Sequence, residues 1–177
     1  MAHVLRTGRS NRCAAVVVGA GVAAICLALG VGPERAALAG AGESCDEWVE
    51  RASSRPAERF EHCTAFDSSR GVLVLYGGST GEDEPHDDTW EWDGETWRLA
   101  ASGGPGERHG AQMAFDSLRG VTVLFGGDST TSTWEWDGVA WTELAVPGPG
   151  VRRLDGAMAF DSVRGVIVLY GGQANLG

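Results

Sequence analysis

The chain has 177 residues, of which 43% are hydrophobic and 21% are charged, and its 14 basic and 24 acidic residues give a formal net charge of −10. This composition is typical of a globular protein and argues against wholesale disorder. The negative charge argues against a nucleic-acid-binding protein, which needs a basic face.

The first 39 residues have the three-part layout of a secretory signal peptide. Arg6, Arg9 and Arg12 form a positively charged start, and an uncharged apolar run follows over residues 13–31. Small residues at the spacing that cleavage requires follow at Ala37-Leu38-Ala39 or at Ala39-Gly40-Ala41. We therefore expect an exported protein that is secreted, periplasmic or held at the cell surface. Because the apolar run is close to the shortest that crosses a bilayer, an uncleaved N-terminal membrane anchor is the alternative.

Two further motifs in this segment are weaker predictors of function. Residues 16–24, VVVGAGVAA, resemble the strand and glycine turn of a dinucleotide-binding fold. No second strand pattern follows them, and Glu34 comes too early to bind a ribose, so we expect no cofactor. Cys26 follows the bulky Ile25, which disfavours a lipoprotein attachment site.

Two cysteines, Cys45 and Cys63, lie beyond the signal segment. An even pair in an exported chain predicts a disulfide, which would stabilise the fold by about 3 kcal/mol through the loop it closes. The alternative is two independent small hydrophobic residues. Two distant cysteines are only half of a zinc site, so we expect no zinc. Residues 40–55 are expected to form a linker.

The rest of the chain is a repeat, which we take as the main indication of its fold. The pattern A-F-D-S-x-R-G, a short apolar run and two glycines occurs over residues 65–78, 114–127 and 159–172. A second pattern, T-W-E-W-D-G, occurs over residues 89–94 and 133–138. Each copy of the first pattern also has an arginine seven residues before its phenylalanine. These arginines are Arg59, Arg108 and Arg153.

Each full repeat is expected to contain four short strands. In the first repeat we predict a strand over 62–66, a tight turn, and a strand over 72–76 that is buried on both faces because it is apolar at every position. A third strand alternates Trp90 and Trp92 with acidic residues, and an Asp-Gly turn leads into a fourth strand over 97–99. No segment has a helical period, so the predicted fold class is all-β.

Four-stranded sheets that recur every 45 to 49 residues, with both faces covered, fit radially stacked blades. The order of these motifs resembles the kelch repeat, and the motif sequences A-F-D-S-x-R-G and T-W-E-W-D-G are similar to those of kelch-like repeats in exported bacterial proteins. The resemblance covers residues 56–177, with repeats at about 56–104 and 105–149 and a partial repeat at 150–177. It implies kelch-type β-propeller blades made of four-stranded antiparallel sheets.

Two groups of residues define these repeats structurally. The paired glycines leave no side chain where backbones crowd, or allow the chain to leave the sheet with a positive φ. The tryptophans supply apolar area between blades, and the alternative for them is stacking on sugar rings. The residues are Gly77, Gly78, Gly126, Gly127, Gly171 and Gly172, with Trp90, Trp92, Trp97, Trp134, Trp136 and Trp141.

The resemblance covers fewer blades than a closed ring needs, because kelch propellers close with several blades and this chain holds about two and a half. An apolar face is therefore expected to stay uncovered at each end. Three explanations remain open: a fragment of a longer gene product, self-association through the open blade edges, and an open stack.

None of the motifs predicts catalysis or a bound metal. Residues 77–81 have the spacing G-x-S-x-G, but no helix pattern follows, as a nucleophile elbow requires. The acidic loop over Glu82–Asp88 is expected to be solvated, with calcium as the alternative. A copper site of the kind found on kelch scaffolds would need Tyr76 or Tyr170 together with histidines around a complete ring.

The predicted function is therefore that of an exported, non-catalytic binding or scaffold module for a protein or a surface glycan. Loops and turns at the rims of the blades are the expected contact surface. The alternative is a partial propeller of a carbohydrate-active or oxidative enzyme, similar to galactose oxidase, whose remaining blades are absent.

Overall fold

The computed structural model describes residues 2–6, 47–51, 55–81, 84–127, 130–146, 148–150 and 153–173, and for the first two ranges the backbone only. Every regular element in these residues is a β-strand, which confirms the predicted all-β class. The chain divides into two compact units, residues 2–51 and the remainder, which we describe separately.

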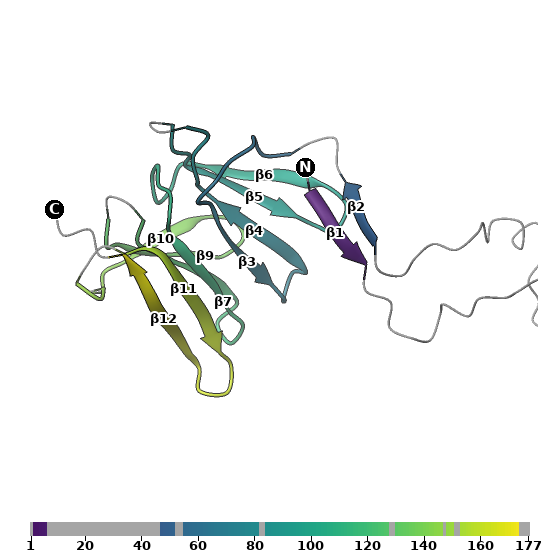
Figure 1. Cartoon of the computed structure of the whole chain (residues 1–177). Helices are drawn as coiled ribbons and strands as arrows, with labels where there is room; N and C mark the ends of the chain where they lie inside the picture. The colour runs from purple at the N-terminus through teal and green to yellow at the C-terminus, as the bar shows by residue number, and fades with distance from the viewer. Residues whose placement is uncertain are drawn as a thin grey trace, which may run out of the picture. The chain divides into compact units, whose positions relative to one another are not determined.

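The larger unit contains two four-stranded antiparallel sheets and one two-stranded hairpin (Figure 1). In the first sheet the strand order is β3-β4-β5-β6, in the second it is β10-β9-β8-β7, and the hairpin is β11-β12. The strands are β3 (Cys63–Asp67), β4 (Val72–Tyr76), β5 (Asp88–Trp92), β6 (Trp97–Ser102), β7 (Gln112–Asp116), β8 (Val121–Phe125), β9 (Thr133–Trp136), β10 (Trp141–Leu144), β11 (Leu154–Asp161) and β12 (Val166–Gln173).

The strands predicted for the first repeat agree closely with those observed. The second strand covers the predicted residues 72–76. The first strand begins one residue later than predicted and includes Asp67, because Asp67 still pairs with Val72 across the sheet before the chain turns. The fourth strand continues to Ser102, beyond the predicted end at Leu99.

The smaller unit is a pair of antiparallel strands, β1 (Ala2–Arg6) and β2 (Glu47–Arg51), in which Val4 lies opposite Val49. The segment expected to be a linker over 40–55 thus includes a strand. Apart from β1, the predicted signal segment and its apolar run lie outside the described residues. No helix of a length and apolarity that would cross a bilayer occurs in the part of the chain that the structure describes.

The hydrophobic core lies between the two four-stranded sheets. Val74 and Tyr76 of β4 are fully buried, as is Leu124 of β8, and Trp136 of β9 is 1% exposed. β4 and β8 are therefore enclosed, as their apolar sequences, interrupted only by Thr122 in β8, predict. β12 has an equally apolar sequence but remains largely exposed, because the described residues add no third strand to its hairpin.

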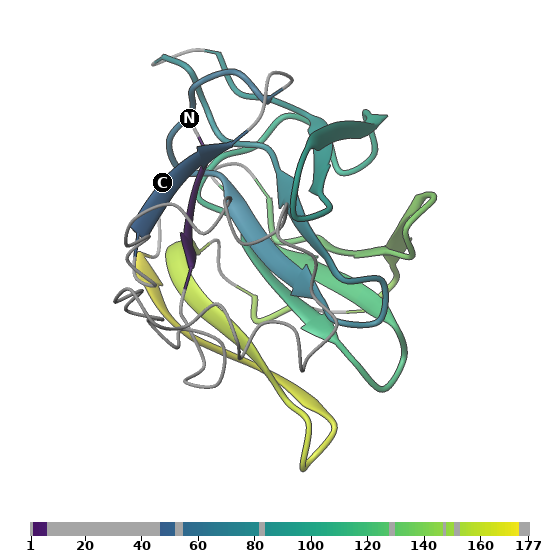
Figure 2. The same cartoon turned by 90° about the vertical axis from the view of Figure 1, so that its right-hand side faces the viewer.

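The first strand of every repeat lies beside its counterpart in the next repeat. We call β3, β7 and β11 the A strands. β7 contacts both β3 and β11, and Figure 1 shows the three strands following one another in the order β3, β7, β11; Figure 2 gives the view turned by 90°. The repeat in the sequence is thus a repeat in space, and equivalent residues of the three copies are brought to one surface.

Candidate functional site

The tight turn after each A strand is held by its aspartate. The Oδ1 atom of Asp67 accepts hydrogen bonds from the backbone N–H groups of Ser69 and Arg70, at 2.9 and 3.1 Å. The Nε atom of Arg70 donates to Oδ2 of Asp67 at 2.6 Å. Gly71 closes the turn with φ +71°, a conformation that favours glycine, and its N–H donates to the Asp67 carbonyl.

The same turn recurs in the second and third repeats. Asp116 accepts from Arg119, and Asp161 accepts from Arg164, both at 2.7 Å. Burial opposes ionisation of Asp116, but the hydrogen bonds from Arg119 and from backbone N–H groups outweigh it and lower the pKa of the carboxyl. The Arg164 hydrogen bond likewise lowers the pKa of Asp161. Both carboxyl groups are therefore held in the charged form.

The arginine before each A strand fixes the diglycine that ends the second strand of its own repeat. In all three copies the guanidinium donates to the carbonyl of the first glycine, eighteen residues further along the chain. Arg59 also forms an ion pair with Asp88 at 2.6 Å. The pairs are Arg59–Gly77, Arg108–Gly126 and Arg153–Gly171, at 2.9, 3.0 and 2.6 Å.

The diglycine of the first repeat lies where that repeat meets the second. Gly77 and Gly78 have φ values of +63° and +89°. A Cβ atom on Gly77 would lie 2.5 Å from the carbonyl oxygen of Arg108, a distance that van der Waals repulsion does not allow. The N–H of Gly78 donates to that same carbonyl at 3.0 Å. Both reasons given for the glycines, crowded backbone and positive φ, apply at this junction.

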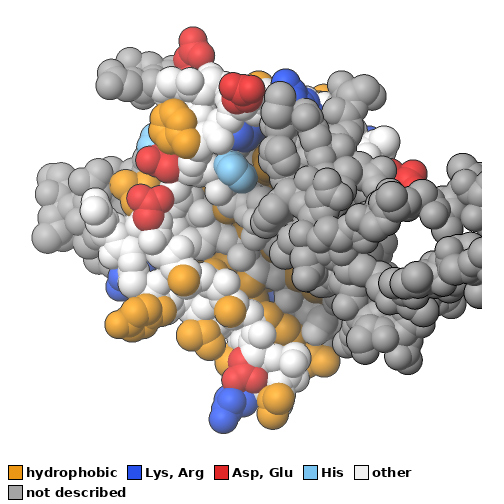
Figure 3. Space-filling model, turned by 45° about the vertical axis from the view of Figure 1, so that its right-hand side comes forward, with side chains coloured by type: hydrophobic (Ala, Val, Ile, Leu, Met, Phe, Trp, Pro, Cys, Tyr) orange, Lys and Arg blue, Asp and Glu red, His pale blue; other side chains and the backbone are white. Residues whose placement is uncertain are grey.

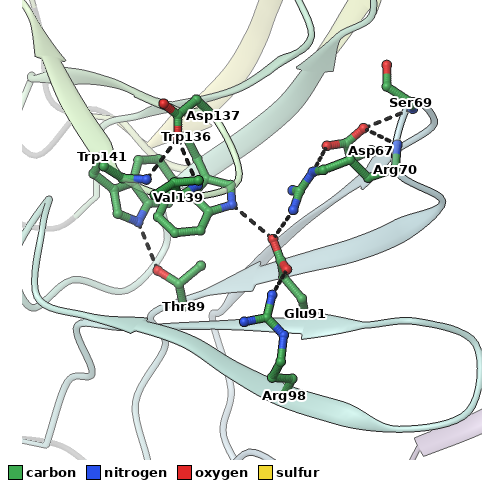
Figure 4. Close-up of polar contacts among 11 residues, drawn as sticks. Asp67, Ser69, Arg70, Thr89, Glu91, Arg98, Trp136, Asp137, Val139 and Trp141 are labelled. Carbon is green, nitrogen blue, oxygen red and sulfur yellow. Dashed lines mark hydrogen bonds and ion pairs between the residues drawn. The ribbon is translucent and has the colours of Figure 1, made fainter.

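The two four-stranded sheets are joined by a polar network around Glu91, which is shown in Figure 4. Its carboxylate, on β5, accepts from Arg70 at 2.7 Å and from Arg98 at 2.6 Å, both within the first sheet. The indole N–H of Trp136, on β9 of the second sheet, donates to Glu91 at 3.1 Å. This buried acceptor therefore contacts donors from both sheets.

A second tryptophan strengthens the same interface. The indole N–H of Trp141 donates to Oγ1 of Thr89 at 2.8 Å, and its ring packs edge-on against Tyr76, with 5.1 Å between ring centres. Trp136 and Trp141 also contact each other, at 5.5 Å. Trp136 and Trp141 of the second repeat thus pack between the two four-stranded sheets. The corresponding pair of the first repeat, Trp92 and Trp97, is in mutual contact and half-buried.

The A strands and their turns line a groove of about 440 Å³. Phe66 is 58% exposed there and Phe115 is buried. Hydrophobic side chains gather on the lower part of the face in Figure 3. The lining comes from four equivalent positions of the three repeats: Thr64, Met113 and Met158; Ala65, Ala114 and Ala159; Phe66, Phe115 and Phe160; Ser68, Ser117 and Ser162. No carboxylate or basic group contributes to this lining.

The candidates for metal binding or nucleophilic chemistry are not brought together. Ser79 forms isolated β-bridges with Phe60 and Pro85, and its hydroxyl donates to the Gly81 carbonyl. Tyr76 donates to the carbonyl of Gly106 at 2.9 Å, and burial raises the pKa of its hydroxyl above the ordinary value. Within the described residues no three histidine, cysteine or acidic side chains gather as a metal site. Of the acidic loop, Glu82 and Asp83 lie outside those residues.

Cys63 is a buried free thiol in the structure, whereas the sequence predicts that it forms a disulfide with Cys45. Its sulfur donates to the Tyr76 carbonyl at 3.5 Å, and burial raises the pKa of the thiol to about 12. Cys45 lies outside the described residues. The structure thus gives no support to the disulfide. The buried position of Cys63 fits the alternative, in which it acts as a small hydrophobic residue of the core.

Sequence reasoning missed two features. The first is the groove, although each residue of its lining is the phenylalanine of a repeat or lies at a fixed distance from it. The second feature is a sequence similarity between residues 48–59, which include part of β2, and residues 97–108, which begin with the fourth strand of the first repeat; the two segments are 49 residues apart. The matched pairs are Trp48 with Trp97, Ser53 with Ser102, Pro56 with Pro105, Glu58 with Glu107 and Arg59 with Arg108.

Comparison with models of protein families and with curated proteins finds no match to this chain.

Proposed function

We propose that this chain is an exported, non-catalytic binding module built from kelch-type β-propeller blades, and that a protein partner binds the groove formed by the A strands. The observation that carries the proposal is the threefold recurrence of the groove's lining. The three equivalent phenylalanines and their neighbours line one shallow groove, in which Phe66 is exposed and Phe115 is buried. A groove that offers both apolar and polar groups can hold a ligand and fix its orientation.

The chemistry of the groove favours a polypeptide over a sugar. Its lining is made of phenylalanine, methionine, alanine, serine and threonine. Sugars are held mainly by stacking on exposed aromatic rings and by charged or amide hydrogen-bonding groups. No charged or amide side chain lines this groove. Its accessible surface is more polar than apolar, which suits hydrogen bonds to the main chain of a peptide, and the exposed Phe66 suits an apolar side chain. The indoles of Trp136 and Trp141 are occupied between the sheets and are not available for stacking.

Selection from a displayed peptide library against the purified chain tests this proposal. We expect enriched peptides to be rich in apolar residues, and their affinity to fall at least tenfold with Phe66→Asp. Val139→Asp is the matched control, because Val139 is 82% exposed in a turn of the second sheet, outside the groove. Circular dichroism of both variants verifies that they fold.

A glycan array, run in parallel, discriminates the second class of partner. Glycan binding that is lost with Trp92→Ala, together with peptide binding that is unchanged by Phe66→Asp, would contradict the proposal and favour the sugar. Trp92 is suited to this test because it is half-buried and pairs with Trp97 on one face of the first sheet.

A further inference from the structure

The tight turns after the A strands differ between the repeats at their tips. All three turns have the sequence Asp-Ser-x-Arg-Gly, and the variable position, which we call the tip residue, is Ser69, Leu118 or Val163. Leu118 is 70% exposed and Val163 is 89% exposed. The second repeat has a neighbour on either side, because β7 contacts both β3 and β11. The exposure of Leu118 therefore comes from its place at the tip of a turn and not from an uncovered sheet.

The second and third turns lie beside each other. A Cβ atom on Gly165, in the third turn, would lie 3.2 Å from Cδ1 of Leu118 in the second turn. The aliphatic tip residues Leu118 and Val163 therefore belong to two adjacent turns, whereas the tip residue of the first turn, Ser69, is polar.

The turns are continuous with the groove of the A strands. In every repeat the serine that precedes the tip residue lines the groove. These serines, Ser68, Ser117 and Ser162, are exposed, and none of the described hydrogen bonds uses their hydroxyl groups. A hydroxyl group both donates and accepts hydrogen bonds, so the row of serines suits the N–H and C=O groups of a polypeptide main chain.

The charges of the three turns are paired with one another. Arg70 forms ion pairs with Asp67 and Glu91, and Arg119 pairs in the same way with an aspartate of its turn and a glutamate of its sheet. Arg164 pairs with the aspartate of the third turn at 2.7 Å. A segment that lies across the turns therefore meets hydroxyl groups, aliphatic side chains and ions that are already neutralised, and this surface fits an uncharged partner.

We propose that the groove and the turn tips together bind one extended, uncharged polypeptide segment, which runs across the A strands and places apolar side chains at alternate positions over Leu118 and Val163. An extended chain advances about 6.7 Å every two residues. Neighbouring A strands have Cα atoms within 8 Å of each other, so every second residue of such a segment faces the next repeat. The inference rests on the proposed function and adds the conformation and the side-chain pattern of the ligand.

Peptides selected from a displayed library against the full chain test the pattern. We expect the enriched peptides to share two apolar residues separated by one position. In a labelled synthetic copy of the most enriched peptide, changing either apolar residue to serine is expected to weaken binding at least tenfold, as measured by fluorescence anisotropy. The same change at the residue between them is expected to leave binding unchanged. Apolar residues spaced three or four positions apart, which is the period of a helix, would overturn the inference.

Variants of the chain test the turn tips, and the first repeat supplies the replacement residue. The double change Leu118→Ser and Val163→Ser gives both turns the tip residue of the first turn and is expected to weaken binding of the peptide at least tenfold. Val139→Ser is the matched control, because Val139 is 82% exposed in a turn that does not line the groove. Ser69→Leu is expected to tighten the binding of a peptide that carries a third apolar residue at the next alternate position. Circular dichroism verifies the fold of each variant.

The outcomes separate this inference from the proposed function. Peptide binding that falls with Phe66→Asp but is unchanged by the double tip variant would overturn the inference and leave the proposed function in place. An equal loss of binding in Val139→Ser and in the double tip variant would overturn the inference as well. Failure to select any peptide would overturn both.

Discussion

The indole N–H of Trp136 donates across the interface between the two four-stranded sheets to the carboxylate of Glu91, 3.1 Å away. The two residues are 45 positions apart in the chain, and both belong to the third strand of their repeat. A buried carboxylate is stable only when donors surround it, and here Arg70 and Arg98 supply the rest. The contact thus joins the motif T-W-E-W-D-G of one repeat to the same motif of the next.

Glu91→Gln is expected to destabilise the protein by about 2 kcal/mol, because the Arg70 guanidinium loses a charge-assisted hydrogen bond in a largely buried setting. Arg98 is 65% exposed and contributes little to this loss. Glu135→Gln is the matched control, since Glu135 has no indole donor among the described contacts, and its cost is expected to be below about 1 kcal/mol. Urea unfolding measures both, and equal losses would contradict the network described around Glu91.

Gly77→Ala is expected to be far more damaging than Gly71→Ala. Both glycines have positive φ, which costs alanine about 1 to 2 kcal/mol at either position. Only at Gly77 would the new Cβ atom also meet backbone, the Arg108 carbonyl at 2.5 Å, whereas nothing lies within 4 Å at Gly71. Thermal unfolding of the two variants measures the difference. A Gly77→Ala protein as stable as Gly71→Ala would show that the repeats do not meet at this diglycine.

The comparison of these two glycines also shows how far the sequence alone was informative. Local patterns predicted the strands, the turns and the need for glycine at 77 and 78, because these depend on residues close in the chain. Partners across repeats, such as the Gly78 N–H with the Arg108 carbonyl or Trp141 with Thr89, required the stacking geometry of the sheets. The groove also depends on that geometry, since three short segments form it only when the A strands lie side by side.

Thr122 is the one polar residue in the otherwise apolar β8, and it is fully buried with no hydrogen-bond partner for its hydroxyl within the described residues. The corresponding positions in the other repeats are Leu73 and Ile167. An unsatisfied buried hydroxyl costs about 1 to 3 kcal/mol, and valine has nearly the same shape. We therefore expect Thr122→Val to raise the free energy of unfolding by about 1 kcal/mol.

Urea titration measures this gain. The matched control is Thr142→Val, at an exposed position of β10, which is expected to change stability by less than about 0.5 kcal/mol. A loss of stability in Thr122→Val would show that the hydroxyl has a partner that the described contacts do not include.

The stability of the protein is expected to fall in acid because of the aspartates in its turns. Asp116 and Asp161 have lowered pKa values in the folded state, in both cases with an arginine hydrogen bond among the causes. A carboxyl whose folded pKa lies below its unfolded value of about 3.9 stabilises the fold fully above that value and loses this contribution as the pH falls through the folded pKa. The free energy of unfolding should therefore be flat from neutral pH to about pH 5 and decline steadily below it.

In Asp116→Asn the protein should be less stable at neutral pH but show a shallower decline, since one of the titrating groups is gone. Unfolding in urea from pH 7 to pH 2.5 measures both curves, and an unchanged acid slope in Asp116→Asn would mean that this turn does not contribute to the acid sensitivity.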